Sequence, residues 1–329
     1  MNREILHAYI SEHQPNICQI VAIKNGRTVY SDYWHNFTPS DTLHVMSVTK
    51  SVVSLLIGIA IDQGFIRDVE QPVLDFFPDY TAKRGEKTIQ QVTLRHLLTM
   101  TAPYKYRSEP WTKVCTSPDW TVAALDLLGG RRGITDEFRY STLGIHILTG
   151  IITRTSGLKT VDFANQYLFG PLDIAPYSNY EALTAEEHKT FILSKEPRKN
   201  IWFCDPQGVA TAGYGLCISA RDMAKLGQLC LNNGMYDGKR LVSSSWITES
   251  TQSRLQSDEA FANMRYGYLW WRPDQDSHAY AALGNSGNVI YINPENNTVI
   301  AVAGTFKPNI FDRVQFIQQY IEPLLHACE

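Results

Sequence analysis

Apolar residues dominate one segment near the start of the chain, residues 43–60. They fall on most sides of a helical wheel, which predicts a helix that is buried almost all round. The segment ends at residues 62–64, where Gly64 suits a C-terminal helix cap because glycine readily adopts positive φ values.

Runs rich in β-branched and aromatic residues lie toward both ends of the chain. Near the N-terminus, residues 18–24 and 28–34 are joined by Asn25-Gly26, a strong hairpin signal. Near the C-terminus, strands are expected at residues 266–271, 279–283, 288–292 and 298–303. Together these runs predict one antiparallel sheet with helices packed on it.

The middle of the chain lacks alternating strand patterns between residue 66 and about residue 200. Helices are expected at residues 4–12, 93–100, 118–128, 143–155, 160–169, 220–231, 244–251 and 311–326. The predicted fold class is therefore α+β, an antiparallel sheet flanked by helices with an inserted all-helical domain. The sheet domain is discontinuous, residues 1–65 plus 246–329, and the mainly helical insert covers residues 66–245.

Composition narrows the classes of protein. The chain has 329 residues, a formal net charge of −3 and no basic run, so nothing indicates binding to nucleic acid or an anionic membrane. The first residues lack the apolar core of a signal peptide, and the apolar segment is too short to span a bilayer. Six scattered cysteines show no metal-ligand spacing. These features favour a cytoplasmic protein with reduced thiols.

A Ser-x-x-Lys pair, Ser47 and Lys50, opens the apolar helix. Residues three apart share a helix face, so the Lys50 amine can reach the Ser47 hydroxyl. Burial lowers the pKa of a lysine, and a neutral lysine beside a serine gives an activated nucleophile. The alternative is a surface serine beside a lysine whose amine reaches solvent.

Two further stretches hold candidate chemistry. Tyr140 precedes a predicted helix that Ser141 or Thr142 can cap, and a tyrosine there can act as a general base; the alternative is an ordinary, partly buried tyrosine. Gly284 and Gly287 frame the start of a strand, where a substrate can approach the backbone closely and accept a hydrogen bond from a backbone N–H group. The alternative is that these glycines only form a tight turn between two strands.

In this order and at these separations, the three elements resemble the serine β-lactamase and penicillin-binding-protein superfamily. The closest likeness is to its class C β-lactamase-related branch, which includes esterases, D-amino-acid peptidases and aminohexanoate-dimer hydrolases. The likeness runs from about residue 18 to residue 306. It is supported by residues 93–101, 219–229, 233–242 and 266–271.

The resemblance implies a role for each matching residue. Ser47 is the acylated nucleophile, Lys50 relays its proton, and Tyr140 is the base in acylation and the acid to the leaving group. The backbone N–H groups of Ser47 and Asn288 form the oxyanion hole. Substrate binding is expected from Thr142, Asn285, Ser286 and Gly287. The reaction implied is acyl transfer through a serine ester, with no metal or organic cofactor.

Two positions depart from the family pattern. Position 142 is Thr where the branch usually has Asn, so it offers no amide donor. Position 285 is Asn where the family often has a lysine that holds a substrate carboxylate. Both departures argue against an efficient β-lactamase or cell-wall carboxypeptidase. Arg107, Arg139 and Arg272 are the loop cations that can replace the lysine.

The sequence thus predicts a serine hydrolase that acts on a small ester or amide. Two alternatives stay open: a catalytically weak penicillin-binding-like protein that works by ligand binding or assembly, and a D-amino-acid peptidase or amidase. The partner expected is a small-molecule substrate, and the oligomeric state is open, a homodimer included. Loop aromatic residues are expected to wall the cleft: Tyr104, Tyr106, Trp111, Trp202 and Phe203.

Overall fold

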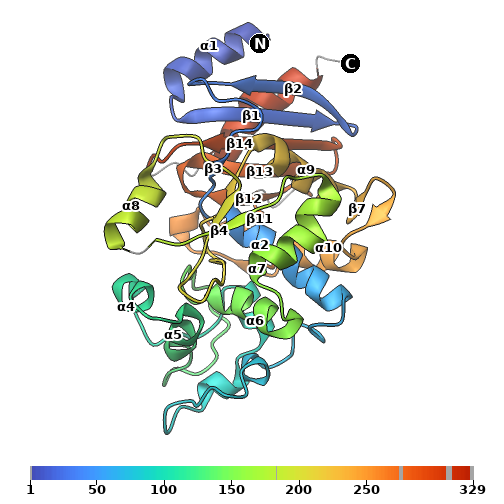
Figure 1. Cartoon of the computed structure of the whole chain (residues 1–329). Coiled ribbons are helices and arrows are strands. Elements are labelled where there is room, and N and C mark those ends of the chain that lie inside the picture. Colours follow the sequence, from blue (N-terminus) through green and yellow to red (C-terminus); the bar gives the residue numbers. More distant parts are fainter. Residues whose placement is uncertain (1, 183, 274–276, 309–312, 327–329) are drawn as a thin grey trace.

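The computed structural model describes residues 2–182, 184–273, 277–308 and 313–326. Its centre is an eight-stranded antiparallel sheet in the order β2-β1-β14-β13-β12-β11-β10-β9 (Figure 1). The strands of this sheet are β1 (Ile17–Lys24), β2 (Arg27–Tyr33), β9 (Leu255–Gln256), β10 (Arg265–Tyr266), β11 (Trp271–Arg272), β12 (Tyr280–Gly284), β13 (Asn288–Asn293) and β14 (Thr298–Gly304). The predicted α+β class with one antiparallel sheet is confirmed.

Both faces of the central strands are buried, and each face belongs to a different core. In β14, Val299 and Ala301 face the larger core around α2 (Val48–Asp62). Ile300 and Val302 face the smaller core, which α1 (Arg3–His13) and the C-terminal helices α11 (Arg313–Phe316) and α12 (Glu322–His326) cover. Because neither face meets water, these strands read as continuous apolar runs.

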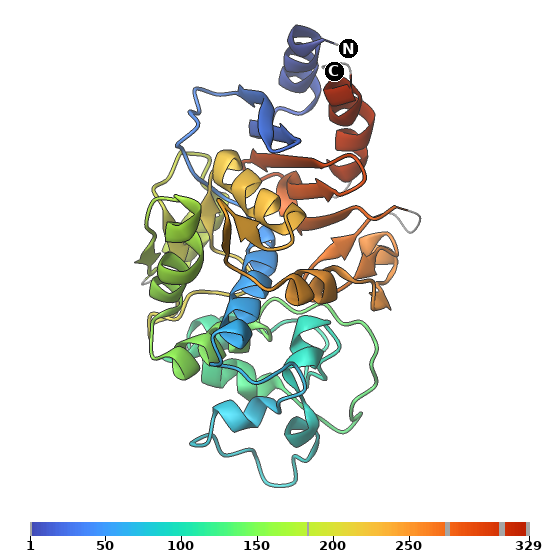
Figure 2. The same ribbon diagram turned by 90° about the vertical axis from the view of Figure 1, so that its right-hand side faces the viewer.

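The remaining helices lie on the side of the larger core. In Figures 1 and 2 those between about residues 90 and 165 gather at the end of the molecule opposite α1. Their bounds are α3 (Leu94–Leu98), α4 (Trp111–Cys115), α5 (Trp120–Leu127), α6 (His146–Ser156), α7 (Thr160–Ala164), α8 (Ala185–Leu193), α9 (Ala220–Leu231) and α10 (Ser244–Thr251). Short two-stranded ladders complete the fold: β3 (Leu43–His44) with β6 (Cys217–Ile218), β4 (Ser178–Tyr180) with β5 (Ile201–Phe203), and β7 (Met235–Tyr236) with β8 (Lys239–Arg240).

Three expectations about the middle of the chain need correction. The strand-free region is wrong, because β4 lies within it and pairs in parallel with β5. The single strand at residues 266–271 is instead a tight hairpin, in which Tyr266 of β10 pairs with Trp271 of β11. The set of expected helices is incomplete, because α4 and α8 lie outside every range that is expected to be helical.

The division into a sheet domain and an insert at residues 66–245 stays a prediction. The packing of α9, which lies inside that range, favours a different boundary. Its residues contact β1, β13 and β14, the centre of the sheet. Within the described residues, no helix combines the length and the apolar composition needed to cross a bilayer.

Candidate active site

Ser47 lies at the first turn of α2, where the chain bends sharply out of β3. Val45 donates its N–H to the Leu216 carbonyl, and Met46 has a φ of 52°, a left-handed conformation that is uncommon for a residue with a side chain. The strain of this bend is held by the β3–β6 ladder on one side and by the buried helix on the other. The bend places the Ser47 side chain at the surface of a cavity.

Lys50 is one helical turn further on, and its side chain is 1% exposed. Its Nζ donates to Ser47 Oγ at 2.9 Å, to the Gly213 carbonyl at 2.7 Å and to Thr142 Oγ1 at 3.3 Å. Burial lowers the pKa of Lys50 to about 7, while the charge of Glu109 acts in the opposite direction and raises it. The lysine therefore exchanges its proton near neutral pH.

When Lys50 loses a proton, its amine changes from a donor of three hydrogen bonds to a donor of two and an acceptor of one. An ammonium uses its three N–H groups on the three acceptors. A neutral amine keeps two N–H donors, enough for Gly213 and Thr142, and gains a lone pair that can accept the Ser47 proton. The contacts to Gly213 and Thr142 thus orient the amine, and the contact to Ser47 is the one that reverses direction.

Tyr140 lies on the opposite side of this amine. Lys50 Nζ is 4.7 Å from the centroid of the Tyr140 ring, a cation–π distance when the amine is charged. Burial raises the pKa of Tyr140, and its hydrogen bond with Ser47 counteracts that only in part. Tyr140 is therefore a neutral phenol at neutral pH. At neutral pH, Lys50 is therefore the group that can be present in its proton-accepting form, whereas Tyr140 holds its proton as a weak acid.

Glu109 is a site residue that the sequence analysis missed. Its Oε1 accepts from the Thr142 N–H at 2.5 Å, the Leu143 N–H at 2.8 Å and Ser141 Oγ at 3.0 Å. It thereby fixes the turn that follows Tyr140. Nothing in its local sequence signals this role, because Glu109 lies in a loop some thirty residues before the turn that it holds.

The pH dependence of acylation tests the Lys50–Glu109 interaction. We expect kcat/KM for a neutral nitrophenyl ester to rise with pH through about 7, because only neutral Lys50 accepts the Ser47 proton. Glu109→Gln keeps an oxygen acceptor but removes the charge that raises the Lys50 pKa, so the inflection should move to lower pH. Glu109→Ala also loses the hydrogen bonds and should lower kcat/KM by about tenfold. An inflection unmoved in Glu109→Gln would contradict this account.

The third motif forms a tight turn between β12 and β13. Asn285–Gly287 is a 3₁₀ turn in which Ser286 has a φ of 72°, and Gly284 pairs with Asn288 across the ladder. Ser286 is buried, and its Oγ accepts the Lys307 N–H, so it faces away from the cavity. Ser286 therefore does not line the cavity, and its place among the substrate-binding residues stays a prediction.

Gly284 brings this turn against the start of α2. A Cβ at Gly284 would lie 2.3 Å from the Val45 carbonyl oxygen and 3.1 Å from the Ser47 nitrogen, so only glycine fits. The Asn288 side chain accepts from the Gly304 N–H and donates to the Asn285 carbonyl. What Asn288 can offer a substrate is therefore its backbone, beside the Ser47 end of the helix.

Most of the predicted site residues line one cavity of about 280 Å³. Ser47, Tyr140, Thr142, Asn285, Gly287 and Asn288 all line it, with Phe261, Met264, Trp271, Leu283, Gly284 and Arg313. Lys50 lies behind Ser47 and does not line it. The aromatic wall is made by Tyr140, Phe261 and Trp271, whose ring centroids are 4.8 to 6.0 Å apart.

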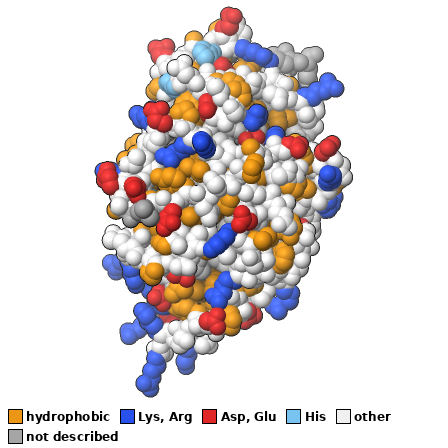
Figure 3. Space-filling view, in the orientation of Figure 1, with side chains coloured by type: hydrophobic (Ala, Val, Ile, Leu, Met, Phe, Trp, Pro, Cys, Tyr) orange, Lys and Arg blue, Asp and Glu red, His pale blue; other side chains and the backbone are white. Residues whose placement is uncertain are grey.

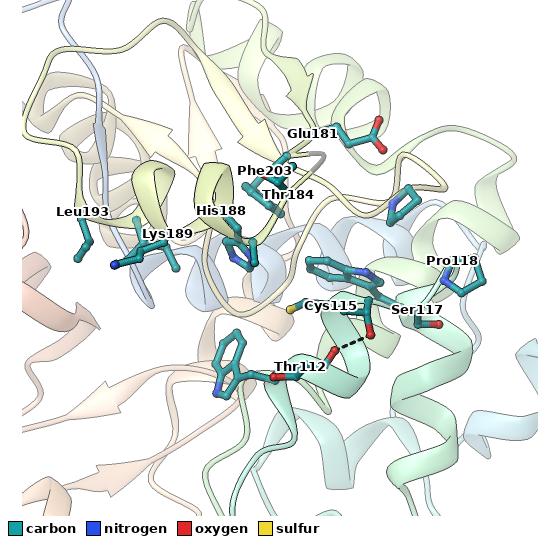
Figure 4. Close-up of a pocket in the computed structure, with 17 residues that line it drawn as sticks. Thr112, Cys115, Ser117, Pro118, Glu181, Thr184, His188, Lys189, Leu193 and Phe203 are labelled. Carbon is teal, nitrogen blue, oxygen red and sulfur yellow. Dashed lines mark hydrogen bonds between the residues drawn. The ribbon is translucent and has the colours of Figure 1, made fainter.

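The predicted wall of loop aromatics is wrong, since none of the five lines this cavity. Trp202 is fully buried and donates to the Thr211 carbonyl, and Tyr106 contacts Ser141 Oγ. Trp111 and Phe203 line a different, larger cavity of about 730 Å³ between α4 and α8 (Figure 4). There His188 and Phe203 lie on one side, and Thr112, Cys115 and Ser117 on the other. Ser47 is absent from its lining.

The expected replacement cations also lie elsewhere. Arg107 and Arg139 line a third cavity, and Arg272 donates to the Ser277 carbonyl. Among the described residues that line the Ser47 cavity, the cation is Arg313. Its guanidinium donates to Gln14 Oε1 at 2.9 Å and to Asn16 Oδ1 at 3.4 Å, and the side chain is 2% exposed.

Comparisons with known proteins agree with this geometry. A family model described as beta-lactamase matches residues 17–317. A 6-aminohexanoate-dimer hydrolase of Paenarthrobacter ureafaciens is 26% identical over 298 residues, which cover 84% of this chain and 70% of the relative.

Solved structures show the same fold. The octameric penicillin-binding protein homologue from Pyrococcus abyssi has a TM-score of 0.72 and 22% identity, with 99% of this chain and 78% of the other covered. A family VIII carboxylesterase has a TM-score of 0.69 and 15% identity, with 99% and 96% covered. Since the family model extends from the first strand of the sheet to the C-terminal helices, this chain belongs to the beta-lactamase family.

Proposed function

We propose that this protein is a serine hydrolase that cleaves small, uncharged esters and amides through an acyl-Ser47 intermediate. The observation that carries the proposal is the contact between Lys50 Nζ and Ser47 Oγ at 2.9 Å, made by a buried lysine with a pKa of about 7. A lysine in that state can activate a serine without a histidine.

In the acylation step, Ser47 Oγ attacks the substrate carbonyl as its proton passes to neutral Lys50. Negative charge then develops on the carbonyl oxygen. The backbone N–H groups of Ser47 and Asn288 are the proposed donors to this oxyanion, because the close approach of Gly284 brings the two backbones together. Backbone donors are held in place by the helix and the sheet, so they need no rearrangement.

Collapse of the intermediate requires a proton for the leaving group. Tyr140 is the proposed relay, since it contacts both Ser47 and Lys50: its phenol is a weak acid, so it gives its proton to the leaving group only as protonated Lys50 replaces that proton. In the second half-reaction, water replaces the leaving group and the same groups act in reverse order.

The cavity limits the size and the charge of the substrate. A volume of about 280 Å³ lies at the lower end of small-molecule sites, which favours short acyl groups. Thr142 and Asn285 carry no charge, and Arg313 donates to Gln14 and Asn16. The lack of charge at positions 142 and 285 supports a preference for neutral substrates, and among the described lining residues Arg313 is the cation that a substrate carboxylate could contact.

The named relatives support both kinds of bond. The carboxylesterase supports an ester, and the 6-aminohexanoate-dimer hydrolase supports a bond between two small units. Because an aminohexanoate dimer carries a free carboxylate, the second relative supports the kind of bond and not the preference for uncharged substrates. We also propose a cytoplasmic location. It is supported by the free cysteines Cys18, Cys115, Cys204, Cys217 and Cys230, since reduced thiols are typical of that compartment.

A substrate comparison tests the proposal. We expect kcat/KM for a neutral nitrophenyl ester to exceed that for nitrocefin, which carries a carboxylate. Asn285→Lys should raise the nitrocefin-to-ester ratio by about tenfold, or about 1.4 kcal/mol, since a charged hydrogen bond is gained. Asn285→Gln is the neutral control and should leave the ratio unchanged. A wild-type ratio well above one would overturn the preference and would assign the carboxylate to Arg313.

A further inference from the structure

A second cavity, of about 670 Å³, is lined by residues of three loops: 101–107, 129–133, and 135 with 137–139. It shares no lining residue with the cavity at Ser47. Its cationic side chains are Lys105, Arg107, Arg131, Arg132 and Arg139, against the single carboxylate of Glu137. This excess of positive charge stands out in a chain whose net charge is −3. On the face in Figure 3, Lys and Arg side chains gather at the end of the molecule opposite α1.

Two of these cations have partners within the protein. Lys105 Nζ lies 3.4 Å from Glu86 Oε2. The Arg139 guanidinium donates to the Tyr104 carbonyl at 2.7 Å and stacks over the Tyr106 ring at 5.0 Å. Arg139 is thus fixed in orientation but is not neutralised by a carboxylate.

The other three cations are Arg107, Arg131 and Arg132. Across residues 2–182, 184–273, 277–308 and 313–326, no carboxylate lies within ion-pair distance of Arg107, Arg131 or Arg132. Like charges around one concave surface repel each other and raise the local positive potential, which an anion would relieve.

The loop that carries Arg131 and Arg132 is held in a defined shape. Gly129 and Gly130 have φ values of 92° and 114°. Gly129 donates to the Pro103 carbonyl, and Gly130 donates to Glu86 Oε2 and accepts from Thr88 Oγ1. The base of the loop is therefore anchored on both sides, and its arginines are presented from a fixed backbone.

We propose that this cavity binds a small polyanion that carries two or more phosphate or carboxylate groups. Guanidinium groups bind both kinds of oxyanion in bidentate fashion, and several around one cavity suit several anionic groups. The volume suits a compact molecule, and the net negative charge of the chain disfavours a long nucleic acid.

The site is close enough to the catalytic loop to influence it. Phe138 and Arg139 line the basic cavity and directly precede Tyr140. The Phe138 ring packs against Trp271 at 6.1 Å, and Tyr106 contacts Ser141 through their hydroxyls at 2.7 Å. A bound anion would therefore touch residues that support Tyr140 without entering the acyl site.

Calorimetric titration of the full chain with inorganic tripolyphosphate and, separately, with citrate tests the proposal and distinguishes phosphate from carboxylate recognition. We expect one equivalent of at least one probe to bind, with affinity that falls as salt rises. The triple variant Arg107→Gln, Arg131→Gln, Arg132→Gln should bind at least about 30-fold more weakly. The affinity of a double variant, Arg131→Gln with Arg132→Gln, should lie between that of the wild type and that of the triple variant. Thermal unfolding verifies that both variants fold.

The matched control removes the same charge elsewhere, at the exposed cations Arg27, Lys199 and Lys239, none of which lines this cavity. It should bind like the wild type, and so should Ser47→Ala, whose binding separates this site from the proposed hydrolase activity. No binding of either probe, equal loss in the control, or tighter binding of a single-stranded oligonucleotide than of both probes would overturn the proposal.

Discussion

Ser47→Ala is expected to lower kcat/KM for p-nitrophenyl acetate by at least about 10⁴-fold, because the hydroxyl that forms the acyl intermediate is gone. The backbone N–H groups and the cavity remain, so only weak residual hydrolysis should persist. The free energy of unfolding should change by less than about 1 kcal/mol, since Ser47 is only half-buried and Lys50 keeps its contacts with Thr142 and Gly213. Steady-state kinetics and chemical denaturation of the same preparations give both values.

Ser54→Ala provides a matched control on the same helix. Ser54 is fully buried and lies outside the cavity, and its hydroxyl has no hydrogen-bond partner among the residues that the structure describes. This variant should therefore hydrolyse the ester at the wild-type rate. A fluorophosphonate probe should label the wild type and Ser54→Ala but not Ser47→Ala. Full hydrolysis by Ser47→Ala would mean that the nucleophile is another residue.

Lys50→Met and Tyr140→Phe are each expected to slow acylation by about 10²-fold or more, the usual scale for a positioned acid or base. Both groups contact Ser47, and they lie within 5 Å of each other, so they serve one proton path. The double variant should therefore lose far less than the product of the two single losses. Pre-steady-state bursts of nitrophenol measure acylation directly.

Different outcomes would assign different roles. Strictly multiplicative losses would mean that Lys50 and Tyr140 act in separate steps. Loss of the pH inflection near 7 in Lys50→Met but not in Tyr140→Phe would assign that inflection to the lysine. Retention of the inflection in Lys50→Met would contradict the proposed role of the amine.

Local signals in the sequence predicted the parts of the fold that depend on neighbouring residues. Asn25 and Gly26 form the β1–β2 turn with positive φ values, and Gly64 follows the end of α2 with a φ of 76°. The chemistry of Ser47 and Lys50 was also local, since one helical turn joins the two residues. Short-range geometry of this kind follows from backbone preferences alone.

Features of the site that depend on contacts between distant segments could not be predicted from the sequence. Phe261 and Trp271 line the cavity because residues 255–272 fold back on themselves as short strands. The sequence pattern of residues 266–271 instead indicates one longer strand. Glu109 acts across a loop, and the five predicted wall aromatics were placed on the wrong surface because exposure in a loop does not say which cavity the loop borders. Tertiary contacts decide these positions.

The order of strands in the sheet has a consequence for biosynthesis. β1 lies between β2 and β14, so Ile17 pairs with Gly304 and almost the whole chain separates two neighbours. A ribosome releases α2, with its apolar surface, long before β12 to β14 exist to cover it. The central sheet therefore cannot be completed until translation is nearly finished. Under the proposed mechanism, the oxyanion hole forms only after the turn that brings Asn288 to Ser47 has been made.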